Sequence, residues 1–286
     1  MKPPFTKLLV TSLLGLLLLT GCGQPPAPDA IQPFRFTVIA DTHFGHKGMP
    51  AANRRLIRAV ETYSGAKPTD LLICGDLTEH GTLEQWNEFC KHYGPGGVCK
   101  LPIKLCTGNH DRPEGSALLN KPPVLAGVTT LHGDLLHRWT SGGVEFLSLD
   151  THPRLLTIYW LKQQLADIGS NTPVVLMFHY NVTGKHSKYW PNKSERALYA
   201  KTLRENPNII AVFHGHHHET TNTTFANTPH LSPGSPKHRD VFLVCDVTGE
   251  AMRVRAVEYR TVKKGLTYNT AWETKINLAP KATPTP

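Results

Sequence analysis

Residues 36–43, FTVIADTH, form a short apolar run that ends at an aspartate and a histidine, and the fold can be predicted from this pattern. The run has no polar alternation, which is typical of a β-strand buried on both faces. Similar apolar runs occupy residues 71–74, 103–106, 174–178 and 209–213. The repetition predicts a sheet whose strands lie in the interior of the protein.

Segments with helical spacing lie between these runs. Residues 53–63 and 194–204 each place their apolar side chains on one face, and Thr82 with Gln85 forms a capping box at the start of a third segment. Strand followed by helix, repeated, predicts βαβ units and a largely parallel sheet. No repeat of fixed period and no second zone of composition is present. We therefore expect one α/β domain.

Two further segments have the pattern of β-hairpins. Residues 138–150 turn at a Ser-Gly-Gly sequence, and residues 240–259 turn at Thr-Gly-Glu. They predict antiparallel strands added to the parallel core. We place the domain at residues 34–262 and expect residues 263–286 to form a C-terminal extension that ends in a disordered tail.

The composition limits the class of protein. The chain has 286 residues, of which 40% are hydrophobic and 19% charged, so it can bury a core and is neither disordered nor a multi-span membrane protein. Its net charge of +9 favours a small anionic partner. Since no Lys/Arg-rich run or cluster of stacking aromatics is present, we expect no specific nucleic-acid partner. The oligomeric state stays open.

The N-terminus is predicted to be a targeting segment. Lys2 and Lys7 precede an apolar run at residues 8–19. The run is too short to span a membrane and is typical of a secretory signal peptide. The ending Leu-Thr-Gly-Cys22 resembles the lipobox of bacterial lipoproteins. The resemblance implies a signal peptide at residues 1–21, a lipid on Cys22 that anchors the exported protein to a bacterial membrane, and a tether at residues 22–33.

Five cysteines remain after Cys22, and an odd number in an exported protein leaves at least one free thiol. Cys90 and Cys99 enclose a glycine-rich loop and are the pair that we expect to form a disulfide, whereas the others lie within apolar runs.

Side chains that bind metals follow each of the five apolar runs. In order, they are Asp41 and His43, Asp76, Asn109 with His110 and Asp111, His179, and His216 with His218. Parallel strands present their carboxyl ends at one edge of a sheet, so these side chains should meet there. Oxygen and imidazole ligands together favour Mn, Fe or Zn over Ca.

The five motifs, in this order, resemble those of the calcineurin-like metallophosphoesterases: DxH, GDxxxxG, GNH[DE], a lone His and GHxH. The resemblance implies a four-layer αββα sandwich of mixed sheets and two divalent metal ions. It assigns Asp41, His43 and His218 to one ion, Asn109, His179 and His216 to the other, and Asp76 to both. It makes His110 the catalytic acid, places Glu79 where relatives orient that histidine, and places His80 where protein phosphatases carry an arginine.

The sequence GDLT at residues 75–78 and the turn Pro233-Gly234-Ser235 resemble those of the branch that contains class III cyclic-nucleotide phosphodiesterases. We therefore expect a hydrolase of phosphate esters, a phosphodiesterase first, in which a hydroxide bridging the two ions attacks phosphorus. A phosphomonoesterase or nucleotidase is the alternative among enzymes. A non-catalytic lipoprotein that binds metal through its His-rich tract, or a scaffold of the same fold, is the alternative outside them.

The segment after His179 is the candidate for substrate recognition, because Lys185 and Tyr189 place a cation and an aromatic ring near a metal ligand. A solvated loop whose aromatic side chains pack on the core explains the same residues. His46, just after the first motif, is the next candidate, and Asp111 is expected to support the site from behind.

Overall fold

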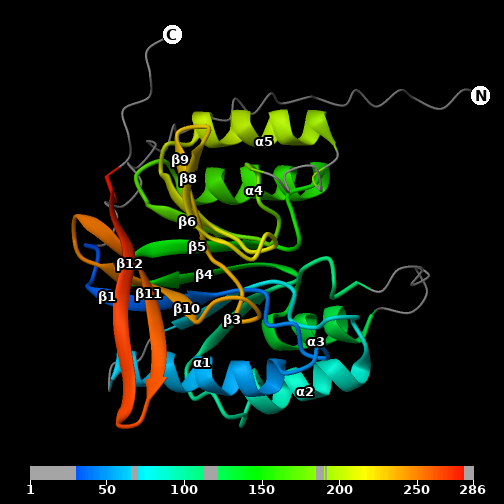
Figure 1. Ribbon diagram of the computed structural model, residues 1–286. Helices are drawn as coiled ribbons and strands as arrows, with labels where there is room; N and C mark the ends of the chain where they lie inside the picture. The colour runs from blue at the N-terminus through cyan, green and yellow to red at the C-terminus, as the bar shows by residue number, and fades with distance from the viewer. Residues whose placement is uncertain (1–29, 66–69, 113–121, 185–189, 191, 280–286) are drawn as a thin grey trace, which may run out of the picture.

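The computed structural model describes residues 30–65, 70–112, 122–184, 190 and 192–279. Two sheets of six strands lie against each other, and helices cover the outer face of each, so that four layers are stacked from top to bottom in Figure 1. The predicted single α/β domain, a four-layer αββα sandwich of mixed sheets, is confirmed.

The first sheet has the strand order β12-β11-β10-β1-β2-β3. Its strands are β1 (Phe34–Ile39), β2 (Asp70–Cys74), β3 (Ile103–Cys106), β10 (Val241–Val247), β11 (Ala251–Val262) and β12 (Gly265–Asn277). β1, β2 and β3 are parallel, and the remaining pairs are antiparallel. The predicted hairpin of β10 and β11 therefore extends a parallel core, as expected.

The second sheet has the order β4-β5-β6-β7-β9-β8. Its strands are β4 (Leu136–Ser141), β5 (Val144–Leu149), β6 (Val174–Met177), β7 (Ile209–Phe213), β8 (Thr220–Phe225) and β9 (Thr228–Pro233). The four central strands are parallel, and the edge strands β4 and β8 are antiparallel to their neighbours. The predicted hairpin of β4 and β5 is confirmed.

In the described part of the chain, five helices cover the sheets: α1 (Met49–Ser64), α2 (Leu83–Tyr93), α3 (Pro123–His132), α4 (Leu155–Ile168) and α5 (Lys193–Glu205). The first three pack on the first sheet, and α4 and α5 pack on the second (Figure 1). Thr82 starts α2 as predicted, since its Oγ1 accepts a hydrogen bond from the Gln85 amide at 3.3 Å. The Gln85 side chain instead accepts from the His80 amide, so the capping box is only half formed.

The largest apolar core lies between the two sheets. Phe36 of β1 packs edge-on against Phe146 of β5 and Phe213 of β7, with ring centroids 5.2 and 5.6 Å apart. Burying an aromatic side chain of this size contributes on the order of 2–3 kcal/mol. These contacts fix the two sheets relative to each other and thereby the loops that leave their carboxyl ends.

The predicted end of the domain at residue 262 was placed too early. β12, which lies in the expected C-terminal extension, pairs with the full length of β11, from Ala251 opposite Asn277 to Val262 opposite Gly265. The edge strand alternates polar residues on its outer side, so its sequence resembles that of an exposed segment. Residues 280–286 lie outside the described residues.

The domain begins before residue 34, so the last residues of the predicted tether belong to the fold. Ile31 packs against the core, and the Gln32 amide donates to the Gly142 carbonyl at 3.0 Å. Residues 1–29, including the predicted signal peptide and Cys22, lie outside the described residues. Among the described helices, none combines the length and hydropathy needed to cross a bilayer.

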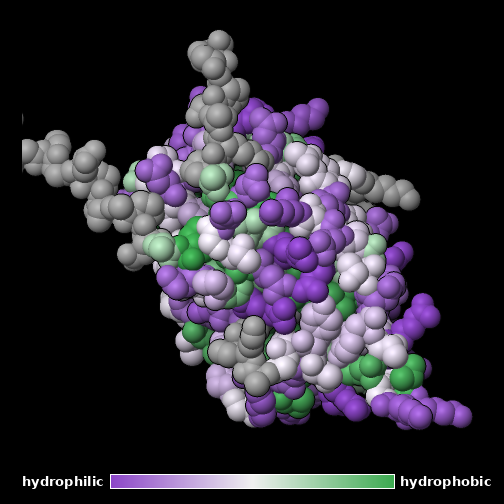
Figure 2. All heavy atoms as spheres, turned by 90° about the vertical axis from the view of Figure 1, so that its left-hand side faces the viewer, coloured by the Kyte–Doolittle hydropathy of each residue, from purple (hydrophilic) through white to green (hydrophobic). Residues whose placement is uncertain are grey.

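The face with β11 and β12 is largely hydrophilic, as Figure 2 shows.

The expected disulfide is absent, because Cys90 and Cys99 are both free thiols. The loop between them brings Cys99 beside His92, two residues beyond Cys90, because the Cys99 amide donates a hydrogen bond to the His92 carbonyl. Burial raises the pKa of each thiol to about 11, so both stay protonated near neutral pH.

Candidate metal centre

The predicted ligands sit on the loops that leave the carboxyl ends of five parallel strands. Five of them have a left-handed backbone, which residues other than glycine rarely adopt: Asp41, His43, Asp76, His216 and His218, with φ between 43° and 76°. Conformations of this kind cluster at functional sites, where surrounding contacts hold them. The tight turns aim side chains from both sheets toward one region.

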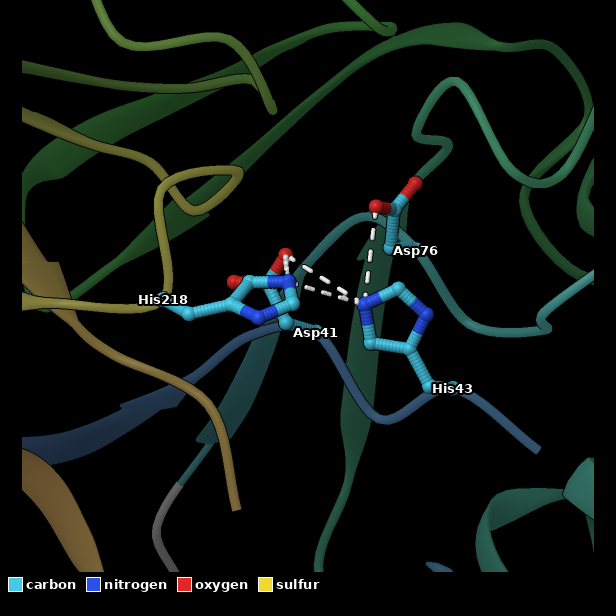
Figure 3. Close-up of side chains that lie close together, drawn as sticks. All are labelled: Asp41, His43, Asp76 and His218. Carbon is cyan, nitrogen blue, oxygen red and sulfur yellow. Dashed lines mark hydrogen bonds and ion pairs between the residues drawn. The ribbon is translucent and has the colours of Figure 1, made fainter. Parts of the chain in front are cut away.

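The first group of ligands is formed by Asp41, His43, Asp76 and His218. Their ligand atoms lie within 4.8 Å of one another and turn inward, as Figure 3 shows. The two imidazole Nε2 atoms of His43 and His218 are 3.0 Å apart. Asp41 Oδ1 is 3.5 Å from the second of these atoms, and Asp76 Oδ2 is 3.7 Å from the first. Two ligands about 2.1 Å from one ion are about 3.0 Å apart at right angles and about 3.4 Å apart at the tetrahedral angle, so these spacings are close to those of a shared cation.

The second group of predicted ligands shares Asp76 with the first. Its Oδ2 atom, the same atom that faces His43, is 3.2 Å from Nε2 of His179. Asn109 Oδ1 is 3.1 Å from that nitrogen and 3.0 Å from Nδ1 of His216. One carboxylate oxygen therefore faces both groups of ligands.

The charges of these groups suit divalent cations. Asp41 and Asp76 are almost fully buried. Burial raises the pKa of Asp41. Burial would also raise the pKa of Asp76, but the surrounding histidines His179, His43 and His110 together outweigh it and hold that pKa below its ordinary value. Burial also lowers the pKa of His43 to about 3 and that of His218 to about 4, so both imidazoles are neutral and can coordinate a metal. A buried cation would offset the buried carboxylate charge.

His110 lies at the side of this cluster and is oriented by a backbone group. Its Nδ1 donates to the Glu79 carbonyl at 2.8 Å, so Nε2 is the nitrogen left to act on a substrate. The Glu79 carboxylate, which we expected to orient His110, lies 2.9 Å from Nδ1 of His43 instead. Glu79 thus serves both histidines, one through its backbone and one through its side chain.

Asp111 has a supporting role, as expected of a residue behind the site. Its carboxylate accepts hydrogen bonds from the backbone amides of Leu77, Thr78 and Gly108, at 2.8–3.1 Å, and from the Thr78 hydroxyl at 2.8 Å. These bonds tie the loop after β2 to the loop after β3. The relative position of Asp76 and Asn109 depends on this link.

An open cavity of about 610 Å³ lies over the cluster. It is lined by Asp76, Asn109, His110, His216, His217, His218, Glu219, His238 and Arg239. His80 is exposed and His46 lines a separate groove beside the start of α2, so neither of these two predicted residues lines the cavity. Lys185 and Tyr189 lie outside the described residues, while Trp190 is 3% exposed and packs on Phe178 and Tyr199.

His238 and Arg239 line the cavity and were not predicted from the sequence. The segment that carries them is fixed to the first ligand, because Ser235 Oγ donates to the Asp41 carbonyl at 2.9 Å and the Ser235 carbonyl accepts from both residues' amides. The His238 ring lies 5.2 Å from that of His218. The Pro-Gly-Ser turn after β9 was the available signal, since β9 is parallel to β7 and ends at the same edge.

Tyr180 was also missed. Its ring centroid lies 4.5 Å from that of the predicted ligand His216 and 4.8 Å from that of His152, on which it stacks. Tyr180 directly follows the predicted ligand His179 in the sequence. Its contact with His216, on the loop after β7, could not be predicted before the structure placed the two loops side by side.

Known proteins are similar to this chain in sequence. A family model described as calcineurin-like phosphoesterase matches residues 34–220. The chain is 24% identical over 203 residues to the glycerophosphodiester phosphodiesterase GpdQ of Enterobacter lignolyticus (strain SCF1), covering 65% of this chain and 72% of that one.

Solved structures are similar in fold. A dimetal phosphatase from Danio rerio has a TM-score of 0.63 at 12% identity, over 87% of this chain and 100% of that one. The inner membrane complex anchor GAP50 of Plasmodium has a TM-score of 0.60 at 15% identity, over 88% and 90%. At such low identity these similarities show the fold alone.

Proposed function

The chain belongs to the calcineurin-like phosphoesterase family, a family of metal-dependent phosphoesterases, and from this premise we propose that it is a binuclear phosphodiesterase. The observation that carries the proposal is the position of Asp76 Oδ2, which faces His43 at 3.7 Å and His179 at 3.2 Å. A single oxygen between two sets of ligands is what a bridging carboxylate requires. The proposed ligands are Asp41, His43 and His218 for one ion, Asn109, His179 and His216 for the other, and Asp76 for both.

Two divalent ions, Mn, Fe or Zn, would supply an activated water and neutralise charge on the phosphate oxygens. The side chains of this chain would orient the ester and move the proton. His110 holds its Nδ1 proton on the Glu79 carbonyl, which leaves Nε2 to donate a proton to the leaving oxygen. The cavity over the cluster is wide enough for a small phosphate ester.

The name of the relative GpdQ supports a diester as substrate. The exposed position of His80 also supports a diester. His80 stands where protein phosphatases carry a phosphate-binding arginine, and it does not line the cavity. A phosphomonoesterase is the second candidate, and Arg239 favours it. This guanidinium lines the cavity and offers a bidentate partner for a dianionic phosphate.

The test of the proposed function is hydrolysis of bis(p-nitrophenyl) phosphate and p-nitrophenyl phosphate with added Mn²⁺, together with a count of bound metal. We expect faster turnover of the diester and two ions per chain. Asp76→Asn should lower the metal count and reduce turnover by orders of magnitude. Asp70→Asn, at the start of the same strand, is the matched control and should change little. An Asp76→Asn protein that holds two ions and is fully active would refute the bridge.

We also propose that the protein is exported and anchored through a lipid on Cys22. The support is the sequence alone: a short apolar run with a cationic start that ends at Leu-Thr-Gly-Cys. The mature N-terminus should carry acyl chains that mass spectrometry detects, and Cys22→Ala should abolish them. Recovery of acylated Cys22→Ala protein in the membrane fraction would contradict this anchor.

A further inference from the structure

Two strand ends from different sheets meet beside the metal-ligand cluster. Thr107 follows β3 in the first sheet, and Asp150 and Thr151 follow β5 in the second. The Thr107 hydroxyl donates to the Asp150 carboxylate and lies 3.1 Å from the hydroxyl of Thr151. These contacts join the two sheets at the edge that carries the ligands.

Arg112 connects this junction to the loop that carries Asn109. Its guanidinium forms an ion pair with Asp150, and its Nε donates to the Thr151 hydroxyl at 3.2 Å. Its own backbone amide donates to the Asn109 carbonyl, also at 3.2 Å. One side chain of the first sheet's loop thereby grips two residues of the second sheet.

The other end of the junction reaches the remaining ligands of the second group. The Thr151 carbonyl accepts hydrogen bonds from the amides of His179 and Tyr180, both at 3.0 Å. The Tyr180 ring in turn packs against His216. Asn109, His179 and His216 are therefore all linked to the same short set of contacts.

Asp150 has a backbone conformation that needs such support. Its φ is 61°, in the left-handed region that residues other than glycine seldom occupy. Its carboxylate is held from one side by Thr107 and from the other by Arg112. This strained turn also places the Thr151 carbonyl under the His179 backbone.

We propose that Arg112 and Asp150 are positioning residues that hold the ligands of the second metal ion, Asn109, His179 and His216, in coordinating geometry across the two sheets. The inference rests on the proposed binuclear function. The first ion, held by Asp41, His43 and His218, does not depend on this pair. Supporting residues of this kind typically change metal affinity about 10- to 100-fold.

The test is titration of the metal-free full chain with Mn²⁺, followed by calorimetry and by electron paramagnetic resonance, which distinguishes an isolated ion from a coupled pair. Arg112→Ala should weaken binding of the second Mn²⁺ by about 10- to 100-fold and leave the first unchanged. Arg112→Lys should fall between, because it keeps the charge but loses the planar fork. Asp150→Asn should weaken the second ion as well.

Arg138→Ala is the matched control. It removes another ion pair of the second sheet, Arg138 with Glu145 at 2.8 Å, in which the arginine is about as exposed as Arg112. It should lower the melting temperature without changing either affinity. Parent-like binding of both ions in Arg112→Ala and Asp150→Asn overturns the inference, as does equal weakening of both ions in these variants and in the control. If Arg112→Ala does not fold, the other two variants decide. A parent chain that binds only one ion refutes the proposed function itself.

Discussion

Gly108 lies against the proposed bridging carboxylate with no room for a side chain, and replacing it with alanine tests the centre directly. A Cβ atom at this position would lie 2.1 Å from Asp76 Oδ1 and 2.3 Å from the Asp76 backbone nitrogen. Real Cβ contacts stay above 3.0 Å, so the carboxylate or the loop must move by about 0.9 Å. The Asp111 bond to the Gly108 amide prevents the loop from retreating freely.

A displacement of about 1 Å in a reacting group typically costs about 10²-fold in rate, which equals about 2.7 kcal/mol of transition-state stabilisation. We therefore expect Gly108→Ala to lower kcat/KM for bis(p-nitrophenyl) phosphate by about 10²-fold and to lower the metal count. The crowding should also destabilise the fold by about 1–3 kcal/mol, seen as a lower melting temperature.

Gly249→Ala is the control for this substitution. A Cβ there would meet only the Ile31 carbonyl, at 3.9 Å, so activity and stability should stay at the parent level. If Gly108→Ala binds two ions and turns over the diester at the parent rate, Asp76 is not the bridge that the geometry indicates.

Three further predictions concern the acid, the metals and a distant ion pair. His110→Ala should keep both ions and lose about 10²–10⁴-fold in turnover, least for nitrophenyl esters, whose leaving oxygen needs little protonation; an equal loss for alkyl esters would contradict a role as acid. Chelation with EDTA should lower the melting temperature of the parent, since ligand at 100 times its Kd stabilises by about 2.7 kcal/mol, and an unchanged value would argue against a resident metal. Burial alone would raise the pKa of Asp246, but Arg35 and Arg255 hold it below its ordinary value of 3.8. That stabilising charge is present above about pH 4 and is lost as the pH falls through the lower folded pKa, so Asp246→Asn should destabilise the protein at pH 7 and progressively less below pH 4. Chemical denaturation across this range checks it, and an equal loss at pH 7 and pH 2 would count against the pairing.

The buried strands, and the candidate ligands that follow each of them, were predicted from local sequence and from the motif resemblance. The apolar run Leu71–Cys74 predicts a buried strand, and the Gly75-Asp76 that follows it predicts a functional side chain at the end of that strand. Parallel pairing within each sheet, together with the stacking of the two sheets, then brings the five strand ends to one side of the sandwich. Sequence alone did not predict β12, because an edge strand with polar outward residues lacks the continuous apolar run of a buried strand.

The buried strands and the residues that follow each one can be predicted without the structure, because burial and turn chemistry depend on near neighbours along the chain. Three features required the folded protein: Arg239 lines the cavity while His80 does not, the Glu79 carbonyl holds His110, and Arg112 reaches Asp150. Each of these contacts joins segments whose meeting depends on how the loops turn and how the two sheets stack. That placement comes from the packing of the whole core, which no single segment encodes.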